Sequence, residues 1–409
     1  MQLLDQTLRS YDERDTTANG SPQHHSNLSN SRWKRLKTQH NASLYAERHR
    51  GERRDLFMPG EKWQNPVVLL AVGHIEGTLD EVMLGLTTQS FGDMQLRAAS
   101  LSSQNIRGAM LAKLSGPTED DPFHCLNVAW MVGEQKWPLS MVVCPRDFVN
   151  LSAFGIITRP NGDRIGYELV QPAQLSQCPA LPKPITRGKM LYGALYRELN
   201  GTVDVYIQLH METMSTIVNS MMMNAMWIVA LGFWKAPQLS EEKKVEWCIV
   251  TSMMKKMKHK SIESQARKGP LHCSSCKAVL VPREFFQATN VCAACSCLLC
   301  FKCRIKRTIK TTTGRSTGRV TRNVTVVVCQ GCWGLLIDER PAKVAWEQYQ
   351  YRMMYSTADT CSSSEPIWGV ADSSTMFAWS PDRHFSVSDV FATFSDEEDL
   401  ADNFALVRL

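Results

Sequence analysis

Apolar and polar residues alternate over much of the first half of the chain. Apolar residues recur at every second position from Leu126 to Val132, which is the period of a β-strand. Further alternating segments are separated by Asn161-Gly162 and by Asn200-Gly201. Because an Asn-Gly pair between alternating segments is a strong hairpin signal, residues 123 to 209 are predicted to form an antiparallel meander, interrupted by one Pro-rich connection.

Helical patterns flank this meander. Thr78 and Glu81 form a capping box before apolar residues at helical spacing, so a helix is predicted there. A second helix is expected from about Phe91, and a third is expected to end near Leu114. After the meander, residues 211 to 235 are predicted to form one long helix that is apolar around most of its circumference.

The two ends of the chain have a different composition. Residues 1 to 60 are rich in Ser, Asn, Gln, His and Arg with little periodicity, which predicts a disordered basic tail. An arm that contacts an anionic surface is the alternative interpretation. Residues 341 to 409 become Ser-rich and then acidic, which predicts a largely disordered acidic tail. Between the tails, we expect one domain over residues 61 to 260 and a smaller one over residues 265 to 340.

Composition and charge exclude several classes of protein. The 409 residues are 44% apolar and 21% charged, so the chain has enough apolar residues for more than one core. The net charge of +6 is too small to indicate nucleic acid, and no nucleic-acid partner is expected. The apolar stretch from Met221 to Trp234 is shorter than the roughly 20 residues that span a bilayer. We therefore expect a cytoplasmic protein with reduced thiols.

Nine of the fourteen cysteines lie between Cys273 and Cys332, and eight of these nine form four CxxC pairs. A two-residue spacing lets both sulfurs of a pair bind one tetrahedral zinc ion. The four-residue gap between the second and third pairs is too short for these two pairs to share one relaxed site, so we expect alternate pairing. The predicted ligands of the first zinc are Cys273, Cys276, Cys300 and Cys303, and those of the second are Cys292, Cys295, Cys329 and Cys332. Sites with four thiolates leave no open position, so both ions are expected to be structural.

Cys297 is a ninth cysteine and leaves a second interpretation open. If Cys297 replaces Cys292 as a ligand, the spacing becomes that of a RING-type ubiquitin ligase module. The polar pair Ser274-Ser275 and the absence of Pro at Gln330-Gly331 count against it. Whether Cys292 or Cys297 binds zinc therefore separates two functions.

A basic segment follows the third CxxC pair. From Lys302 to Arg322 there are eight Lys or Arg residues and no acid, in a pattern that predicts a hairpin. One interpretation is contact with an anionic membrane, and the other is compensation of the charge of eight thiolates. The candidate membrane contacts are Lys302, Arg304, Lys306, Arg307 and Lys310.

Taken together, these motifs resemble a known family. The four CxxC pairs and their gaps resemble a FYVE-type zinc finger, and the phrases PTEDDPFHCLNVAWMV, CPRDFVNL and NGDRIGYELV resemble the START-like lipid-transfer domain that precedes such fingers in START–FYVE proteins. The resemblance covers about residues 60 to 340. It implies a helix-grip fold of class α+β, in which an antiparallel sheet wraps a long C-terminal helix around a lipid. The usual basic phosphoinositide motif is missing, because the matching positions hold Ala288 to Val291 and Val327-Val328.

The resemblance implies a non-enzymatic adaptor, and the chain has none of the GxSxG, HExxH, GxxxxGK or GxGxxG motifs of common enzymes. Its implied partners are a lipid in the START-like domain, an anionic membrane surface such as that of endosomes, and a protein bound through the finger or tails. A RING-like ligase remains one alternative. A protein–protein scaffold whose START-like interior is filled by its own side chains is another.

Overall fold

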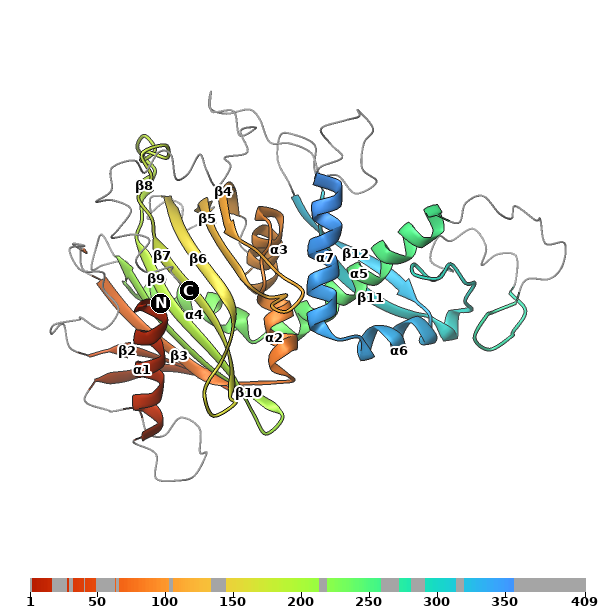
Figure 1. The fold of residues 1–409 in the computed structure, drawn as a ribbon, viewed down its shortest axis with the longest axis horizontal. Coiled ribbons are helices and arrows are strands. Elements are labelled where there is room, and N and C mark those ends of the chain that lie inside the picture. The colour runs from red at the N-terminus through yellow and green to blue at the C-terminus, as the bar shows by residue number, and fades with distance from the viewer. Residues whose placement is uncertain are drawn as a thin grey trace. The chain divides into compact units, whose positions relative to one another are not determined.

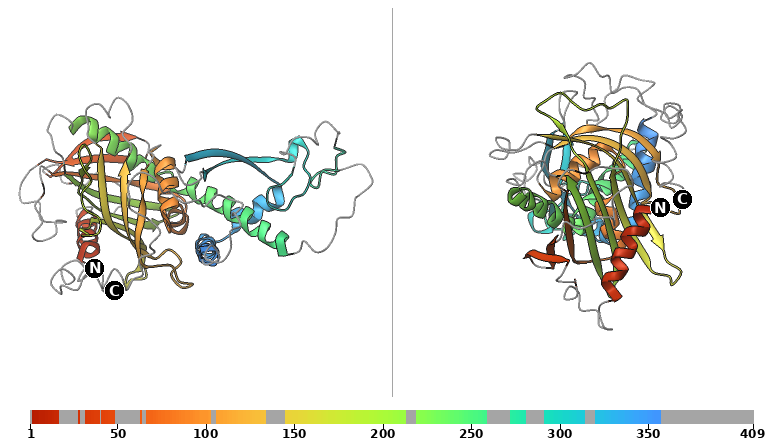
Figure 2. Two further views of the ribbon diagram at one scale, coloured as in Figure 1. Left: turned by 90° about the horizontal axis from the view of Figure 1, so that it is seen from above. Right: turned by 90° about the vertical axis from the view of Figure 1, so that its left-hand side faces the viewer.

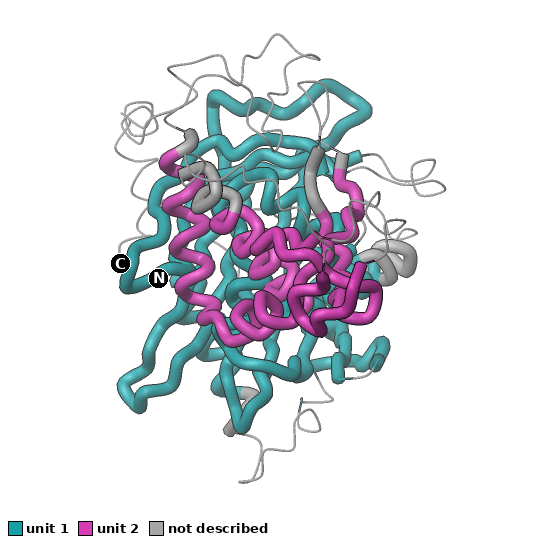
Figure 3. Tube along the Cα trace, turned by 90° about the vertical axis from the view of Figure 1, so that its right-hand side faces the viewer, with its two compact units in different colours: residues 1–237, 376–409 teal, residues 238–375 magenta. Residues whose placement is uncertain are grey.

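The computed structural model describes residues 2–16, 28, 32–39, 41–48, 63, 66–102, 106–133, 145–212, 219–258, 272–280, 291–313 and 320–356. The chain divides into two compact units between Pro237 and Gln238, shown in different colours in Figure 3. We call the described residues up to Pro237 the sheet unit and those from Gln238 onward the cysteine unit. Each unit is described by itself.

The sheet unit is built on one ten-stranded sheet, so the expected α+β class is confirmed for this unit (Figure 1). The strand order is β1-β2-β3-β10-β9-β7-β6-β5-β4, all neighbours along it are antiparallel, and the short β8 pairs in parallel with β6. The strands are β1 (Trp33–Gln39), β2 (Ala42–Glu47), β3 (Pro66–Glu76), β4 (Ile106–Ser115), β5 (Cys125–Gly133), β6 (Arg146–Thr158), β7 (Arg164–Pro172), β8 (Thr186–Arg187), β9 (Met190–Leu199) and β10 (Thr202–Glu212).

Both predicted hairpins are present. β6 and β7 pair in register on either side of the turn at residues 159–163, and β9 and β10 meet at Asn200-Gly201. Asn200 and Gly201 have φ values of 52° and 81°. A two-residue hairpin turn with both φ values positive matches the right-handed twist of the strands, and Asn and Gly tolerate it best. Turn chemistry therefore fixes the register of the central strands.

Three helices cover one face of this sheet, which we call the inner face: α2 (Leu79–Leu86), α3 (Phe91–Leu101) and α4 (Asn219–Phe233). Capping boxes at Thr78 and Ser90 begin α2 and α3, as predicted for the first. A Cβ atom on Gly232 would lie 2.6 Å from the Cβ of Leu101, so α4 packs directly on α3. Figure 2 shows α4 and α1 on opposite sides of the sheet.

The opposite, outer face is covered by α1 (Gln2–Thr16). Leu3 and Tyr11 are buried, and the Tyr11 hydroxyl donates a 2.8 Å hydrogen bond to Oδ2 of Asp204 on β10. Thr7 lies against Gly193 on β9, where a Cβ would come within 2.3 Å of the Thr7 hydroxyl oxygen. The prediction of a disordered tail over residues 1 to 60 is wrong for α1, β1 and β2, because tertiary contacts with the sheet hold them.

Two other predicted elements differ in the structure. The helix expected to end near Leu114 is instead strand β4, which pairs with β5 along its length. The long helix expected from Met211 begins at Asn219, since Met211 and Glu212 still pair with β3. In both places apolar residues predicted burial correctly, but their short runs did not distinguish a helix from a strand.

The cysteine unit is assembled along α5 (Ala236–Lys258), which lies within the domain predicted over residues 61 to 260. The other elements are the 3-10 helix η4 (Phe301–Cys303), β11 (Ile305–Thr313), β12 (Val320–Val328), α6 (Gln330–Asp338) and α7 (Pro341–Ser356). Val245 and Ile249 of α5 form a buried cluster with Ile309 and Leu336. The predicted boundary at residue 260 therefore differs from the division at Pro237.

The C-terminal tail prediction is wrong for residues 341–356, which form α7. Val344 and Ala345 are fully buried, and Nε1 of Trp247 on α5 donates a 2.8 Å hydrogen bond to Oε2 of Glu347. The remainder of the predicted acidic tail lies outside the described residues.

Candidate metal centres and a buried polar cluster

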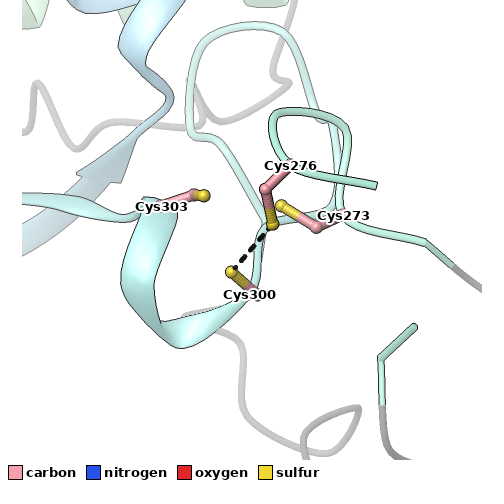
Figure 4. Close-up of side chains that lie close together, drawn as sticks. All are labelled: Cys273, Cys276, Cys300 and Cys303. Atoms are coloured by element: carbon pink, nitrogen blue, oxygen red, sulfur yellow. Dashed lines mark hydrogen bonds between the residues drawn. The ribbon is translucent and has the colours of Figure 1, made fainter. Parts of the chain in front are cut away.

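The first cysteine group contains the four residues predicted for it. The sulfurs of Cys273, Cys276, Cys300 and Cys303 all lie within 4.8 Å of one another. Figure 4 shows the four side chains pointing toward one another from two separate segments, with 3.6 Å between the sulfurs of Cys276 and Cys300. The expected pairing of the first and third CxxC pairs is therefore present in the fold.

The backbone around Cys273 explains how this pair converges. The amide of Cys273 donates to the carbonyl of Ala278, and the amide of Lys277 donates back to the carbonyl of Cys273. Lys277 has a φ of 62°, which reverses the chain directly after Cys276. This tight turn places both sulfurs on the same side of the loop.

The second cysteine group differs from the prediction in one member. The sulfurs of Cys292, Cys295, Cys297 and Cys329 lie within 4.8 Å of one another, so Cys297 occupies the place expected for Cys332. The sequence posed a choice between Cys292 and Cys297, but the structure brings both into the group. The choice that remains is between Cys297 and Cys332.

Cys332 stays close to this group. Its amide donates a 3.4 Å hydrogen bond to the sulfur of Cys329. Cys295 and Cys329 are 3.8 Å apart between their sulfurs, and Cys292 accepts a hydrogen bond from the amide of Cys329. Five thiols therefore surround a position that needs four.

The turns in the two cysteine groups are similar. The amide of Cys292 donates to the carbonyl of Cys297, and Ser296 has a φ of 60°, so this loop repeats the turn around Cys273. In that repeat Cys297 corresponds to Ala278, which is not a ligand in the first group. Cys329 also begins a helix with Cys332 three residues later, as Cys300 precedes η4 and Cys303.

The thiols differ in acidity. Although burial opposes the change, hydrogen bonds from the backbone of Cys276, Cys300 and Ser275 lower the pKa of Cys273 to about 6. Burial, together with hydrogen bonds to neighbouring sulfurs, raises the pKa of both Cys297 and Cys332. Each group thus holds thiols whose protons would be released when a cation binds.

Both groups fit a zinc ion. A tetrahedron with Zn–S bonds of about 2.3 Å has sulfur–sulfur edges of about 3.8 Å. The measured separations of 3.6 Å in the first group and 3.8 Å in the second agree with this edge. All the cysteines of the two groups are free thiols. Two metal ions can therefore be held, and a site of four thiolates would give each ion a structural role.

Two of the five basic candidates contact α5. Arg307 donates a 2.8 Å hydrogen bond to Oε1 of Glu241 and lies 4.0 Å from the centre of the Trp333 ring. The backbone amide of Lys310 donates to Glu242 on the same helix, α5. Arg307 is therefore engaged in contacts within the cysteine unit, and its membrane role stays a prediction.

The other three candidates surround one exposed aromatic side chain. Phe301 is 67% exposed, although it lies between the ligand candidates Cys300 and Cys303. The guanidinium of Arg304 and the ammonium of Lys306 lie 4.9 and 5.6 Å from the centre of its ring. Lys302 is exposed beside it. The cations were predicted from the sequence, but the exposure of Phe301 among them was not.

A buried polar cluster lies on the inner face of the sheet unit. Arg97 on α3 donates a 2.7 Å hydrogen bond to Oε2 of Glu168 on β7, and the Tyr192 hydroxyl donates to the other carboxylate oxygen. Arg97 also donates to the carbonyl of Leu86, and its guanidinium lies 5.1 Å from the centre of the Phe233 ring. The side chains of Arg97 and Glu168 are 14% and 8% exposed.

The Glu168 carboxylate controls the charge of this cluster. Burial alone would lower the pKa of Arg97, but the carboxylate outweighs it and raises that pKa. Burial and the same carboxylate raise the pKa of Tyr192. The pair is therefore an internally balanced ion pair, and the tyrosine stays a neutral donor. The sequence did not indicate this pairing, since its partners are 71 residues apart.

Within the described part of the chain, every helix falls short of the length and apolarity needed to cross a membrane.

Comparison with solved structures returned lipid-transfer proteins. The human StAR-related lipid transfer protein 5 aligns with 57% of this chain and 98% of its own, at 17% identity and a TM-score of 0.36. The human StarD13 lipid transfer and protein localization domain aligns with 57% of this chain and 95% of its own, at 11% identity and a TM-score of 0.35. The STAR-related lipid transfer protein from Xanthomonas axonopodis aligns with 50% of this chain and 96% of its own, at 14% identity and a TM-score of 0.33. No protein-family model and no curated protein matches the chain.

Proposed function

We propose that this protein is a non-enzymatic lipid-binding adaptor. The sheet unit would hold an apolar ligand between its inner face and α4, as START-like domains do, and the cysteine unit would dock the protein on a membrane. The observation that carries the proposal is the buried polar cluster of Arg97, Glu168 and Tyr192 between the sheet and the helices of its inner face. Buried charges are costly unless they are paired, and ligand sites characteristically place a few polar groups in an apolar lining.

The cysteine unit is proposed to be a two-zinc finger of the FYVE type. The internal parallel between the two turns supports Cys292, Cys295, Cys329 and Cys332 as the second ligand set, with Cys297 as an additional thiol. Val327 and Val328 stand where FYVE fingers carry a basic residue, and both are buried in the finger core. We therefore expect weak or no selectivity for phosphatidylinositol 3-phosphate.

Membrane contact is proposed to occur through Phe301 and the cations around it. Aromatic rings favour the interface between lipid and water, and each nearby Lys or Arg contributes about 1 kcal/mol of attraction to an anionic surface. Lys302, Arg304 and Lys306 supply the cations, and Phe301 supplies the ring. The protein would then be cytoplasmic, with peripheral attachment to endosomal or other anionic membranes.

Native mass spectrometry of the purified full chain tests this function. The expected spectrum shows a bound lipid together with two zinc ions per chain. A chain with two zinc ions and no lipid, also after incubation with mixed lipid vesicles, would favour the protein–protein scaffold with a filled interior. A chain with fewer than two zinc ions under reducing conditions would contradict the zinc-finger part.

A further inference from the structure

The second cysteine group holds one thiol more than a structural zinc ion takes. The sulfur of Cys297 shares hydrogen bonds with those of Cys295 and Cys329, and it lies within 4.8 Å of the sulfur of Cys292. The sulfur of Cys332 also shares hydrogen bonds with those of Cys295 and Cys329. Because a structural zinc takes four ligands, one thiol stays free beside four zinc-bound thiolates. In the proposed ligand set, the free thiol is that of Cys297.

The first cysteine group has the same turn without the additional thiol. In each turn the second cysteine of the CxxC pair, Cys276 or Cys295, is exposed and is followed by a residue with positive φ. A small reagent in solution can therefore reach one ligand of each group. The next position holds Ala278 in the first turn and Cys297 in the second. The two turns thus differ in whether a free thiol lies beside the exposed ligand.

We infer that Cys295 and Cys297 form an oxidation site, at which a hydroperoxide joins their two sulfurs in a disulfide. The inference rests on the proposed two-zinc finger. Metal binding keeps Cys295 a thiolate, which is the form of cysteine that attacks an oxidant. Its sulfur attacks one peroxide oxygen and becomes a sulfenic acid, while the O–O bond breaks and hydroxide leaves. The Cys297 thiol then attacks the sulfenic sulfur, and the disulfide forms with loss of water.

The two groups should differ in their response to the oxidant. In the second group, Cys297 is not held by a cation and is free to attack, and the disulfide removes Cys295 from the ligand set. Three thiolates then remain, so a competing chelator can withdraw the zinc ion. In the first group, the neighbours of a sulfenic acid on Cys276 are other ligands, such as Cys300 with its sulfur 3.6 Å away. These sulfurs are already bound to zinc, so disulfide formation should be slow there.

The test treats the full chain, with both zinc ions bound, with hydrogen peroxide and follows zinc release with a colorimetric chelator. We expect one zinc ion per chain to leave at least about tenfold faster than the other, because only the second group has a free thiol that can resolve a sulfenic acid. Mass spectrometry after free thiols are blocked should find the Cys295–Cys297 disulfide forming at the rate of the fast release. Dithiothreitol and added zinc should restore two ions per chain.

Two reciprocal substitutions move the additional thiol between the turns. Cys297→Ala gives the second turn the residue of the first, so this variant should hold two zinc ions and release both slowly. Ala278→Cys adds the thiol to the first turn and should make the release of both ions fast. Cys248→Ala is the matched control, because this thiol of α5 also packs against the core of the cysteine groups but lies outside both turns. It should keep one fast and one slow ion.

The outcomes separate the inference from the function on which it rests. If the untreated chain holds fewer than two zinc ions, the zinc-finger part of the proposed function fails and the inference fails with it. If two ions are bound and leave at the same rate, or the disulfide lacks Cys297, the finger stands and the oxidation site is overturned. Fast release from Cys297→Ala, or loss of a zinc ion from it before treatment, overturns the inference as well. The wild-type disulfide and Ala278→Cys remove no thiol, so they stay informative if Cys297→Ala does not fold.

Discussion

The sheet unit buries whole aromatic and aliphatic side chains on both faces of a continuous ladder, whereas the cysteine unit buries mainly its thiols and a smaller number of aliphatic side chains. Tyr11, Tyr196 and Phe123 are among the largest side chains fully enclosed in the sheet unit. The core around the cysteine groups consists mainly of Cys, Val, Leu and Ala. Apolar burial can stabilise the first unit by itself, but the second depends on what its thiols bind. The two units should therefore respond to different perturbations.

Loss of a metal ion should give the largest difference between the two units. A structural zinc contributes on the order of 10 kcal/mol to the folding of a small finger, so Cys273→Ser should lower the zinc content from two to one and unfold the loops around residues 272–313. The sheet unit should keep its protection. Zinc analysis combined with hydrogen exchange resolved along the chain measures both. Cys178→Ser, at a free thiol of the sheet unit, is the control that should change neither.

The choice between Cys297 and Cys332 gives the next largest effect. If the second site repeats the first, Cys332→Ser should lose the second zinc and Cys297→Ser should keep both, because Cys297 corresponds to Ala278. Zinc content of the two variants after gel filtration is the measurement. Loss of zinc in Cys297→Ser with full occupancy in Cys332→Ser would assign the site to the sulfurs that lie closest in the structure.

The buried ion pair gives a smaller effect, confined to the other unit. Arg97→Met leaves the Glu168 carboxylate buried without its cation, which should lower the free energy of unfolding of the sheet unit by about 3–5 kcal/mol. The double variant Arg97→Met with Glu168→Met removes both charges and should recover most of this loss. Zinc content should stay at two in both. Equal destabilisation of the single and double variants would show that packing, rather than charge, dominates at this position.

The sequence predicted well whatever depends on neighbouring residues. Asn200-Gly201 predicted a hairpin, and Thr78 predicted the start of a helix. Both predictions succeeded because turns and helix caps depend on residues that are close in sequence. The first cysteine group followed from spacing for the same reason. The presence of Cys297 in the second group did not follow from spacing. The five thiols of Cys292, Cys295, Cys297, Cys329 and Cys332 allow more than one set of four ligands.

Features that depend on distant partners were missed. The buried stripe of α1 consists of Leu3, Thr7 and Tyr11. Because one of the three is a polar Thr and they are four residues apart, the sequence pattern was too sparse to indicate a buried helix. β1 lies at the edge of the sheet and carries exposed Lys and Arg, as edge strands often do, so it resembled a tail. Glu168 occupies an ordinary strand position, and only the tertiary fold brings Arg97 to it.

Membrane attachment should show the smallest effect and should belong to the cysteine unit alone. Lys302→Gln with Lys306→Gln removes two exposed cations beside Phe301, which should weaken binding to anionic vesicles by about 2 kcal/mol, or roughly thirtyfold. Arg307→Gln removes the same charge per residue from the same segment, but this charge is paired with Glu241 and lies over the Trp333 ring. It should weaken binding less than either lysine substitution.

Sedimentation with vesicles of phosphatidylcholine and phosphatidylserine at two salt concentrations measures this binding. Added salt shortens the screening length, so it should weaken binding of the wild type most. Phe301→Ala should lower the part of the binding that salt does not remove. If Arg307→Gln weakens binding as much as the lysine pair, net charge rather than the surface around Phe301 holds the protein on the membrane.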